Sequence, residues 1–434
     1  MARRTVPAPA RPLRCRTLVG VPSALPTGDP PPPDGRLPRV VLDQAAAAPF
    51  GVYVHVPFCQ VRCGYCDFNT YTAEELGPGV SRGSYADTVL RELRLAADVL
   101  GDGDALGGRI PPVTSVFFGG GTPTLLPAEH LGLIIAEIAE RFGLADDVEI
   151  TTEANPETVT PGYLTRLREA GFTRVSVGMQ SAVPRVLDVL DRRHRPGRPE
   201  EVVAEARAAG FEHVNLDLIY GAPHETDADW QASLDAAVAA GPDHVSAYAL
   251  VVEEGTALAR QVAAGVVPPP DEDVQADRYV MADETLRTAG FDWYEISNWA
   301  TSPAARSRHN ELYWSDANWW GLGPGAHSHV SGVRWWNVKH PVRYAALLDA
   351  GHSPAAGRET LDDEARLTER VMLAVRRREG LAADGLPPAA AGVLPQLASW
   401  GLIDQQSLAA DRIVLTQRGR LLADAVVKEL LTAG

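Results

Sequence analysis

Short apolar runs alternate with helical patterns over most of this chain. The apolar runs predict strands over residues 51–56, 116–118, 148–151, 175–177, 214–219 and 245–250. Apolar positions at helical spacing predict helices over 84–100, 128–142, 199–209 and 227–240, with a further helix after Pro161. Six strand-then-helix units in series predict a parallel sheet covered by helices. We therefore expect an α/β fold built as a partial (β/α)6 barrel, with a doubly wound open sheet as the alternative.

The segments outside these units differ in composition. Residues 1–48 are rich in proline and arginine and carry too little apolar surface to offset the entropy of ordering, so we predict a disordered segment. Residues 49–299 hold the predicted barrel, and residues 300–359 form a connecting region rich in tryptophan and glycine.

The last segment, residues 360–434, has a pattern of its own. It predicts helices over 364–378 and 392–400, then short strands over 401–403 and 412–415. Thr416 is suited to be the N-cap of a final helix. Helices followed by a small hairpin resemble a winged helix, so we expect a winged-helix-like α+β domain here.

Composition and charge narrow the class of protein. The chain has 434 residues, 45% of them hydrophobic, and a net charge of −16, which argues against a general nucleic-acid binder. Only four cysteines are present, three of them in one loop, so a secreted disulfide scaffold is excluded. No apolar stretch is long enough to span a membrane and no apolar run follows Met1 as in a signal peptide. We expect a cytoplasmic protein, with peripheral contact to a membrane left open.

Cys59, Cys63 and Cys66 are spaced C-x3-C-x2-C. Three thiolates this close can hold one inorganic cluster, and a [4Fe–4S] cluster usually takes four, so one iron would stay open to a small molecule. The alternatives fit less well. Structural zinc takes four protein ligands, a disulfide leaves one cysteine unpaired, and a redox C-x-x-C motif needs only Cys63 and Cys66. Cys15 lies in the N-terminal segment and is not assigned as a ligand.

Polar residues stand at or shortly after the ends of the predicted strands. They are the turn Gly120, Gly121 and Thr122, then Glu153, Gln180, Arg192 and Asp217. Glycine backbone can approach a ligand closely, a carboxylate such as Glu153 can pair with an ammonium or a ribose hydroxyl, and Arg192 can bind a carboxylate as a fork. Each alone is also explained as an ordinary strand-end group. Because the carboxyl ends of parallel strands share one edge, together they predict a binding ring.

The cysteine spacing, with Tyr65 just before the third cysteine, resembles the radical S-adenosylmethionine (SAM) superfamily. That resemblance implies a [4Fe–4S] cluster on Cys59, Cys63 and Cys66, with SAM on the open iron. Within the superfamily, the chain is similar to proteins related to the oxygen-independent coproporphyrinogen III oxidases. The resemblance then implies cofactor-binding roles for Tyr53, Tyr65, Gly120, Gly121, Thr122, Glu153, Gln180, Arg192 and Asp217.

This related group has two branches. The true oxidases carry a further cysteine two residues after the third cluster cysteine, where this chain has Phe68, and they use an ordered N-terminal region. The second branch consists of heme chaperones marked by H-N-x-x-Y-W, which this chain carries from His309 to Trp314. The resemblance to that branch implies heme as a ligand and hemoproteins, such as respiratory proteins, as acceptors, with no residue assigned a catalytic role.

His309 is the candidate heme ligand in this motif. A neutral imidazole can ligate heme iron, and Tyr313 and Trp314 can pack on a porphyrin face. The alternatives are a structural loop that closes the barrel with His309 as a hydrogen-bonded polar residue, or iron ligation by His327 or a cysteine. Two other functions remain open: oxidative decarboxylation of coproporphyrinogen III, and a winged-helix regulator with an iron–sulfur sensor.

Overall fold

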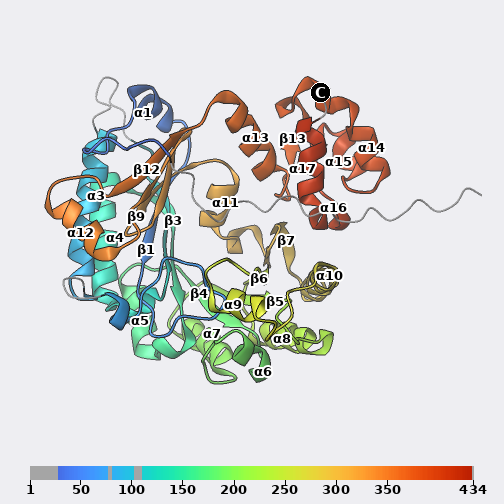
Figure 1. Ribbon diagram of the computed structural model, residues 1–434, viewed down its shortest axis with the longest axis horizontal. Helices are drawn as coiled ribbons and strands as arrows, with labels where there is room; N and C mark the ends of the chain where they lie inside the picture. The colour runs from blue at the N-terminus through green and yellow to red at the C-terminus, as the bar shows by residue number, and fades with distance from the viewer. Residues whose placement is uncertain (1–27, 77–80, 102–109, 433–434) are drawn as a thin grey trace, which may run out of the picture.

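A curved sheet of twelve strands dominates the computed structural model (Figure 1), which describes residues 28–76, 81–101 and 110–432. The strands lie in the order β12-β11-β10-β9-β1-β2-β3-β4-β5-β6-β8-β7. The central strands are β1 Phe50–Val56, β2 Val113–Gly120, β3 Leu144–Ala154, β4 Arg174–Gln180, β5 His213–Tyr220 and β6 His244–Ala249. The flanking strands are β7 Asp292–Glu295, β8 Asn298–Ala300, β9 Asn318–Leu322, β10 His327–Val330, β11 Val333–Asn337 and β12 Ala355–Thr360.

Strands β1 to β6 are all parallel and follow one another in chain order. This order never reverses, as it must in a doubly wound sheet, so the partial-barrel prediction is confirmed and the alternative is excluded. All residues of β1 except Tyr53 are buried, as expected for a parallel strand covered on both faces.

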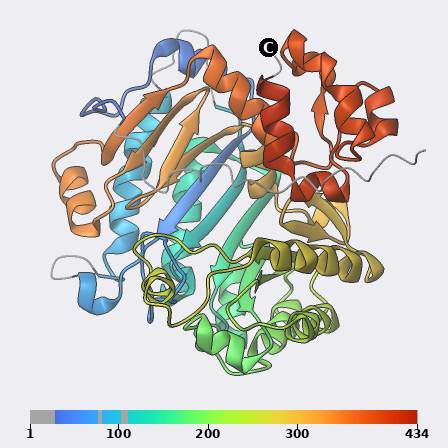
Figure 2. The same ribbon diagram turned by 45° about the vertical axis from the view of Figure 1, so that its right-hand side comes forward.

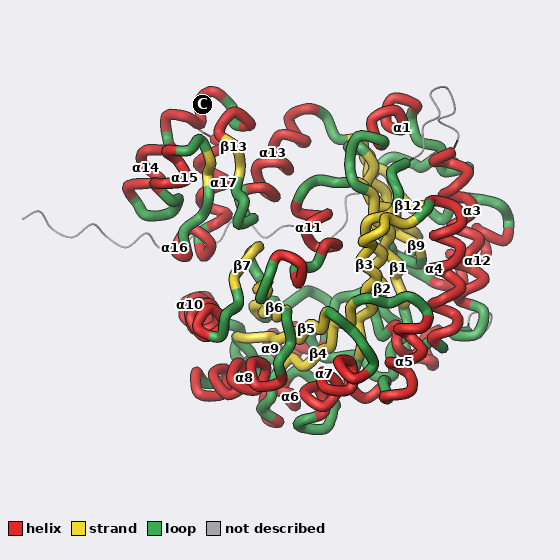
Figure 3. Tube along the Cα trace, turned by 180° about the vertical axis from the view of Figure 1, so that it is seen from behind, coloured by secondary structure: helices red, strands yellow, loops and turns green. Residues whose placement is uncertain are grey.

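Helices cover the outer face of the sheet. Seen from behind, they lie outside the curved sheet, while α11 lies on the opposite, inner face (Figure 3). The helices of the barrel are α3 Tyr85–Gly101, α4 Ala128–Phe142, α5 Pro161–Glu169, α6 Pro184–Val189, α7 Arg198–Ala208, α8 Asp227–Ala240, α9 Ala257–Ala263, α10 Glu272–Thr288 and α11 Arg308–Trp314. Their ends carry the expected caps: Pro161 opens α5, and Thr226 and Asp229 form a capping box on α8.

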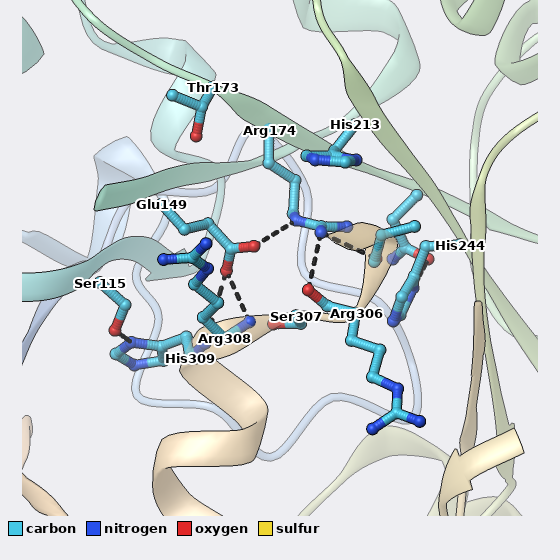
Figure 4. A network of polar contacts seen from close by, with 12 residues as sticks. Ser115, Glu149, Thr173, Arg174, His213, His244, Arg306, Ser307, Arg308 and His309 are labelled. Atoms are coloured by element: carbon cyan, nitrogen blue, oxygen red, sulfur yellow. Dashed lines mark hydrogen bonds and ion pairs between the residues drawn. The ribbon is translucent and has the colours of Figure 1, made fainter. Parts of the chain in front are cut away.

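A buried ion pair fixes α11 inside the barrel (Figure 4). The Nε of Arg174 on β4 lies 2.8 Å from Glu149 Oε2 on β3, and both side chains are almost fully buried. Glu149 Oε1 accepts a hydrogen bond from the backbone N–H of Arg308, the first residue of α11, at 3.0 Å. Arg174 also donates to the carbonyls of Ala305 and Arg306 at 2.8 and 2.9 Å. A carboxylate at this helix start satisfies free N–H groups and suits the helix dipole.

The tryptophan- and glycine-rich region extends the sheet instead of merely connecting two domains. Strand β9 pairs in parallel with β1, and β10, β11 and β12 follow as antiparallel strands. The sequence pattern did not predict this extension, because the partner of β9 lies at the other end of the chain.

The N-terminal segment differs from its prediction from residue 28 onward; residues 1–27, with Cys15, lie outside the described residues. Asp29 forms a β-bridge with Arg358 on the outermost strand β12. Helix α1, Arg39–Ala45, buries Val41 and Ala45, and the Ala45 carbonyl accepts from Asn318 Nδ2 at 3.1 Å. The prediction of disorder is therefore wrong for residues 28–48, because the few apolar side chains here bury against the extended sheet.

The C-terminal part has its own hydrophobic core, separate from the barrel core, and lies beside the sheet (Figure 2). The helices of this part are α13 Asp363–Ala374, α14 Leu394–Ser399, α15 Gln405–Ala409, α16 Gln417–Leu421 and α17 Ala423–Thr432. Two further helices, α2 Ala73–Leu76 and α12 Pro341–Asp349, precede it in the chain. Strands β13, Leu381–Ala382, and β14, Arg412–Ile413, form a small antiparallel pair. Thr416 caps α16 as predicted, accepting from the N–H of Gly419.

One arginine ties this part to the barrel. Arg420 lies 2.7 Å from the Asp283 carboxylate on α10 and donates to the Tyr279 hydroxyl at 3.0 Å. Its guanidinium also stands 4.3 Å from the ring centre of Trp293. A buried ion pair backed by an aromatic face fixes the orientation of the two parts.

We expect Arg174→Leu to lower the free energy of unfolding by about 3 to 5 kcal/mol, because it leaves the Glu149 carboxylate buried without its partner. The control is Arg166→Leu, whose partner Glu129 is largely exposed, and which should cost at most about 1 kcal/mol. Urea denaturation followed by circular dichroism measures both variants. Equal losses in the two variants would contradict the role of the buried pair.

Candidate functional site

The carboxyl ends of the parallel strands surround a cavity of about 500 Å³. This cysteine cavity, as we call it, is lined by the three cysteines and by most of the residues predicted to bind the cofactor. The predicted residues that line it are Cys59, Cys63, Tyr65, Cys66, Gly120, Gly121, Thr122, Glu153, Gln180, Arg192 and Asp217. The fold therefore brings together residues that the sequence spreads over more than 150 positions.

The cysteine loop follows β1 and is held by backbone hydrogen bonds. The N–H of Gly121 donates to the Val56 carbonyl, and the N–H of Thr122 to the Phe58 carbonyl, both at 2.8 Å. A Cβ on Gly121 would lie 2.5 Å from the Phe58 carbonyl oxygen, so only glycine allows this approach. The glycine turn after β2 thus sets the start of the cysteine loop.

A second contact holds the end of the loop, and sequence reasoning missed it. Asn69 Nδ2 donates to the carbonyls of Pro324 and Lys339, at 3.0 and 2.8 Å. The Asn69 carbonyl lies 2.9 Å from His55 Nε2, whose other nitrogen lies 2.9 Å from the Tyr53 hydroxyl. Burial lowers the pKa of His55 to about 4, so its ring is neutral at pH 7. A carbonyl only accepts, so Nε2 carries the proton and Nδ1 accepts from Tyr53.

The thiols of the loop are free and half-buried. Burial raises the pKa of Cys59 and raises that of Cys66 to about 12, so thiolates here require positive charge nearby. Arg192 supplies some of it, with its Nη1 3.8 Å from Cys63 Sγ. Among the described residues, no group of three or more His, Cys, Asp or Glu is placed closely enough to hold a single metal ion.

Arg192 enters the cavity because Gly178 leaves room for it. Its Nη2 donates to the Gly178 carbonyl at 2.8 Å, and a Cβ on Gly178 would lie 2.8 Å from that same nitrogen. Its Nε is buried without a hydrogen-bond partner among the described residues. A buried donor without a partner, beside three thiols, is suited to a ligand that carries acceptor oxygens.

Two carboxyl groups also line the cavity, those of Glu153 on β3 and Asp217 on β5. Glu153 accepts from the N–H of Gly120 at 3.0 Å, and Asp217 accepts from Ser176 and Asn215 at 2.7 and 2.8 Å. Burial, helped by the nearby Asp217, raises the pKa of Glu153 to about 8, and burial also raises the pKa of Asp217. The Glu153 carboxyl is therefore largely protonated at pH 7, so it can donate one hydrogen bond to a ligand as well as accept others.

Tyr53 and His309 do not line this cavity. His309 is buried on the inner face of the sheet, stacked on Phe117 at 5.0 Å between ring centres. Its Nδ1 lies 2.9 Å from the Ser115 hydroxyl and its Nε2 lies 2.9 Å from the Tyr313 hydroxyl. Burial lowers its pKa to about 3, so the ring is neutral, and neither nitrogen is free for iron in this arrangement. This geometry agrees with the alternative interpretation given above, in which His309 is a hydrogen-bonded polar residue and not an iron ligand.

The other residues of the motif line a second cavity, of about 290 Å³. Asn310, Tyr313 and Trp314 face it from α11, and Leu373 of α13 closes it from the C-terminal part. Tyr248, at the end of β6, lines both cavities and was not predicted from the sequence. The position of Tyr248 between the two cavities could be inferred only from the structure, which shows that β6 is the last of the parallel strands β1 to β6.

The sequence and the structure were compared with known proteins. The sequence profile of the radical SAM superfamily matches residues 53–237. Coproporphyrinogen III oxidase (HemN) from Escherichia coli, described as a radical SAM enzyme, has a similar fold, with a TM-score of 0.75 over 92% of this chain and 94% of that one. Its sequence is 22% identical, so this similarity concerns the fold.

Sequence relatives are closer. Heme chaperone HemW of Mycobacterium tuberculosis is 53% identical over 383 residues, which cover 88% of this chain and 95% of the relative. Heme chaperone HemW of Synechocystis is 35% identical, over 81% of this chain and 85% of its own length. This protein therefore belongs to the radical SAM superfamily and, within it, to the family of heme chaperone HemW.

Proposed function

We propose that this protein binds heme and transfers it to acceptor hemoproteins, and that it carries a [4Fe–4S] cluster with SAM. The observation that carries the proposal is the 53% identity to heme chaperone HemW over 95% of that relative's length. The motif from His309 to Trp314 and Phe68 at the position of the oxidases' extra cysteine support the same assignment.

The residues of the cysteine cavity fit the cluster and SAM. Cys59, Cys63 and Cys66 would hold the cluster, which supplies a one-electron redox centre when bound. The glycine turn, with Glu153 and Asp217, would accept and donate hydrogen bonds to SAM, and the free Nε of Arg192 would meet its carboxylate. Gln180 and Tyr65 would complete the cavity wall. Tyr53 does not line the cavity and would contribute indirectly, through its hydrogen bond to His55.

His309 enters the proposal as part of the motif and not as an assigned iron ligand, because both of its nitrogens are hydrogen-bonded. Among the described residues no helix is both long and apolar enough to cross a bilayer. Thiolate ligands need a reducing environment, so we place the activity in the cytoplasm.

The alternative function is oxygen-independent oxidation of coproporphyrinogen III, and the fold shared with HemN is the observation in its favour. Phe68 counts against it, since the oxidases have a cysteine at this position.

We expect Cys59→Ala, Cys63→Ala and Cys66→Ala each to abolish the bound iron of anaerobically reconstituted protein, which should hold about four irons per chain. The matched control is Cys15→Ala, which should keep the iron of the unaltered protein. Iron analysis and electron paramagnetic resonance measure both. Loss of iron in the control, or stoichiometric zinc in the unaltered protein, would refute the assignment.

We expect the affinity for SAM to rise several-fold as the pH rises through about 8, because the ionised Glu153 carboxylate accepts hydrogen bonds more strongly than the neutral acid. The Glu153→Gln variant cannot ionise, so its affinity should be lower and should change less around this pH, where the amino group of SAM also titrates. Titration of cluster-loaded protein at several pH values measures this, and an unchanged pH dependence in Glu153→Gln would contradict it.

We expect the cluster-loaded protein to bind one heme per chain, seen as a shift of the Soret band, and to pass it to an apo-hemoprotein. When coproporphyrinogen is added, the same preparation should not consume it with a matching release of 5′-deoxyadenosine. Repeated turnover of coproporphyrinogen, without heme transfer, would instead establish the oxidase function.

A further inference from the structure

Several large apolar side chains are exposed at the mouth of the cysteine cavity. Nine large hydrophobic side chains are exposed in the described part of the chain, and four of them line this one cavity. Val61 and Phe68 come from the cysteine loop, with 50% and 53% of their surface exposed, and Tyr248 and Val251 come from the end of β6, with 41% and 60% exposed. Exposed apolar groups gathered at one cavity mark a binding surface.

We propose that heme binds across this mouth, with one face on Phe68, Val61 and Val251, outside the space assigned to the cluster and SAM. The proposal rests on the heme binding proposed above and assigns it a place. A porphyrin is a flat apolar disc, and Phe68, Val61 and Val251 offer an apolar surface that is otherwise in water, so covering it is favourable.

The charges at the mouth suit the propionates of heme. Arg62 and Arg193 line the same cavity, and Arg193 is exposed and forms no ion pair within the described residues. The only ion-pair partner of Arg62 in the described part is Glu75, at 3.9 Å, and both side chains are nearly half exposed, so this pair is weak. The acidic residues Asp67, Glu157, Asp191 and Glu253 line the cavity as well, so Arg62 and Arg193 are the groups at the mouth that suit a propionate.

Apart from the thiols assigned to the cluster, only the phenols of Tyr65 and Tyr248 could ligate iron from the described residues of the cavity wall, and a protonated phenol is a weak axial ligand. No histidine or methionine is among the described residues that line it. Heme held by one face and its propionates keeps its iron open to a ligand from another protein. Such attachment is suited to transfer. An acceptor protein with an axial histidine can form a bond to the heme iron, and no iron bond to this protein has to break first.

The second cavity, beside α11, is the competing place. Its volume is about 290 Å³. Its wall includes Glu295, a carboxyl group whose pKa burial raises, and the nearby imidazole of His309 is hydrogen-bonded at both nitrogens. It offers no cation for a propionate among its lining residues.

The test compares variants of the full-length, cluster-loaded protein in anaerobic heme titrations. The double variant Phe68→Asp with Val251→Asp places two carboxylates on the apolar surface, and we expect the dissociation constant for heme to rise at least about tenfold. Arg193→Glu should also weaken binding, and less so at high salt. The matched control is Leu133→Asp, a similarly exposed residue (54%) on the outer helix α4, which should bind heme as the unaltered protein does.

The outcomes separate the two proposals. If the unaltered protein binds no heme, the proposed function fails. If it binds heme and the double variant binds equally well with intact iron content and circular dichroism, heme lies elsewhere and this inference alone fails. His309→Gln, which retains one hydrogen bond, should keep its affinity for heme. If His309→Gln lost its affinity for heme while it stayed folded and iron-loaded, and the mouth variants still bound heme, the heme site would have to be assigned to the second cavity.

Discussion

Two backbone hydrogen bonds hold the start of the cysteine loop in place, and the proposed cluster site depends on them. They run from the glycine turn after β2 to the last residues before Cys59, and they exist because β1 and β2 are neighbouring parallel strands that end at the same edge. The cysteine loop has no helix or strand of its own, so its shape is imposed from outside. From the other side, Asn69 joins it to the loop around Pro324, which belongs to the extension of the sheet. The site therefore depends on contacts between segments that are far apart in sequence.

The barrel could be predicted from the sequence because its signals are local. Strand and helix patterns alternate, and the predicted helix over residues 227–240 coincides with α8, which buries Trp230, Leu234 and Ala237 at helical spacing. The ring of strand-end residues was equally predictable, since parallel strands must bring their ends together. Glu153 and Asp217 face the same cavity as the cysteines for this reason alone.

The parts that could not be predicted rest on long-range packing. No local pattern indicates that β9 lies beside β1, or that α11 enters the barrel and places His309 on Phe117. His309 has the residue type of a heme ligand, but its role depends on whether its two nitrogens find partners, and Ser115 and Tyr313 become neighbours only in the folded chain. The apolar mouth could not be predicted either, because Phe68 and Val251 belong to no common motif and line one cavity only in the folded chain.

The pairing of β9 with β1 also constrains synthesis. Phe50 pairs with Asn318, so the first strand of the barrel leaves the ribosome long before its outer neighbour exists. At about 5 to 20 residues per second, the delay is on the order of tens of seconds. During that time the free edge of β1, with the apolar Val52 and Val54, can pair with other chains. The late strands β9 to β12 thus cover an edge that the early part of the barrel leaves open.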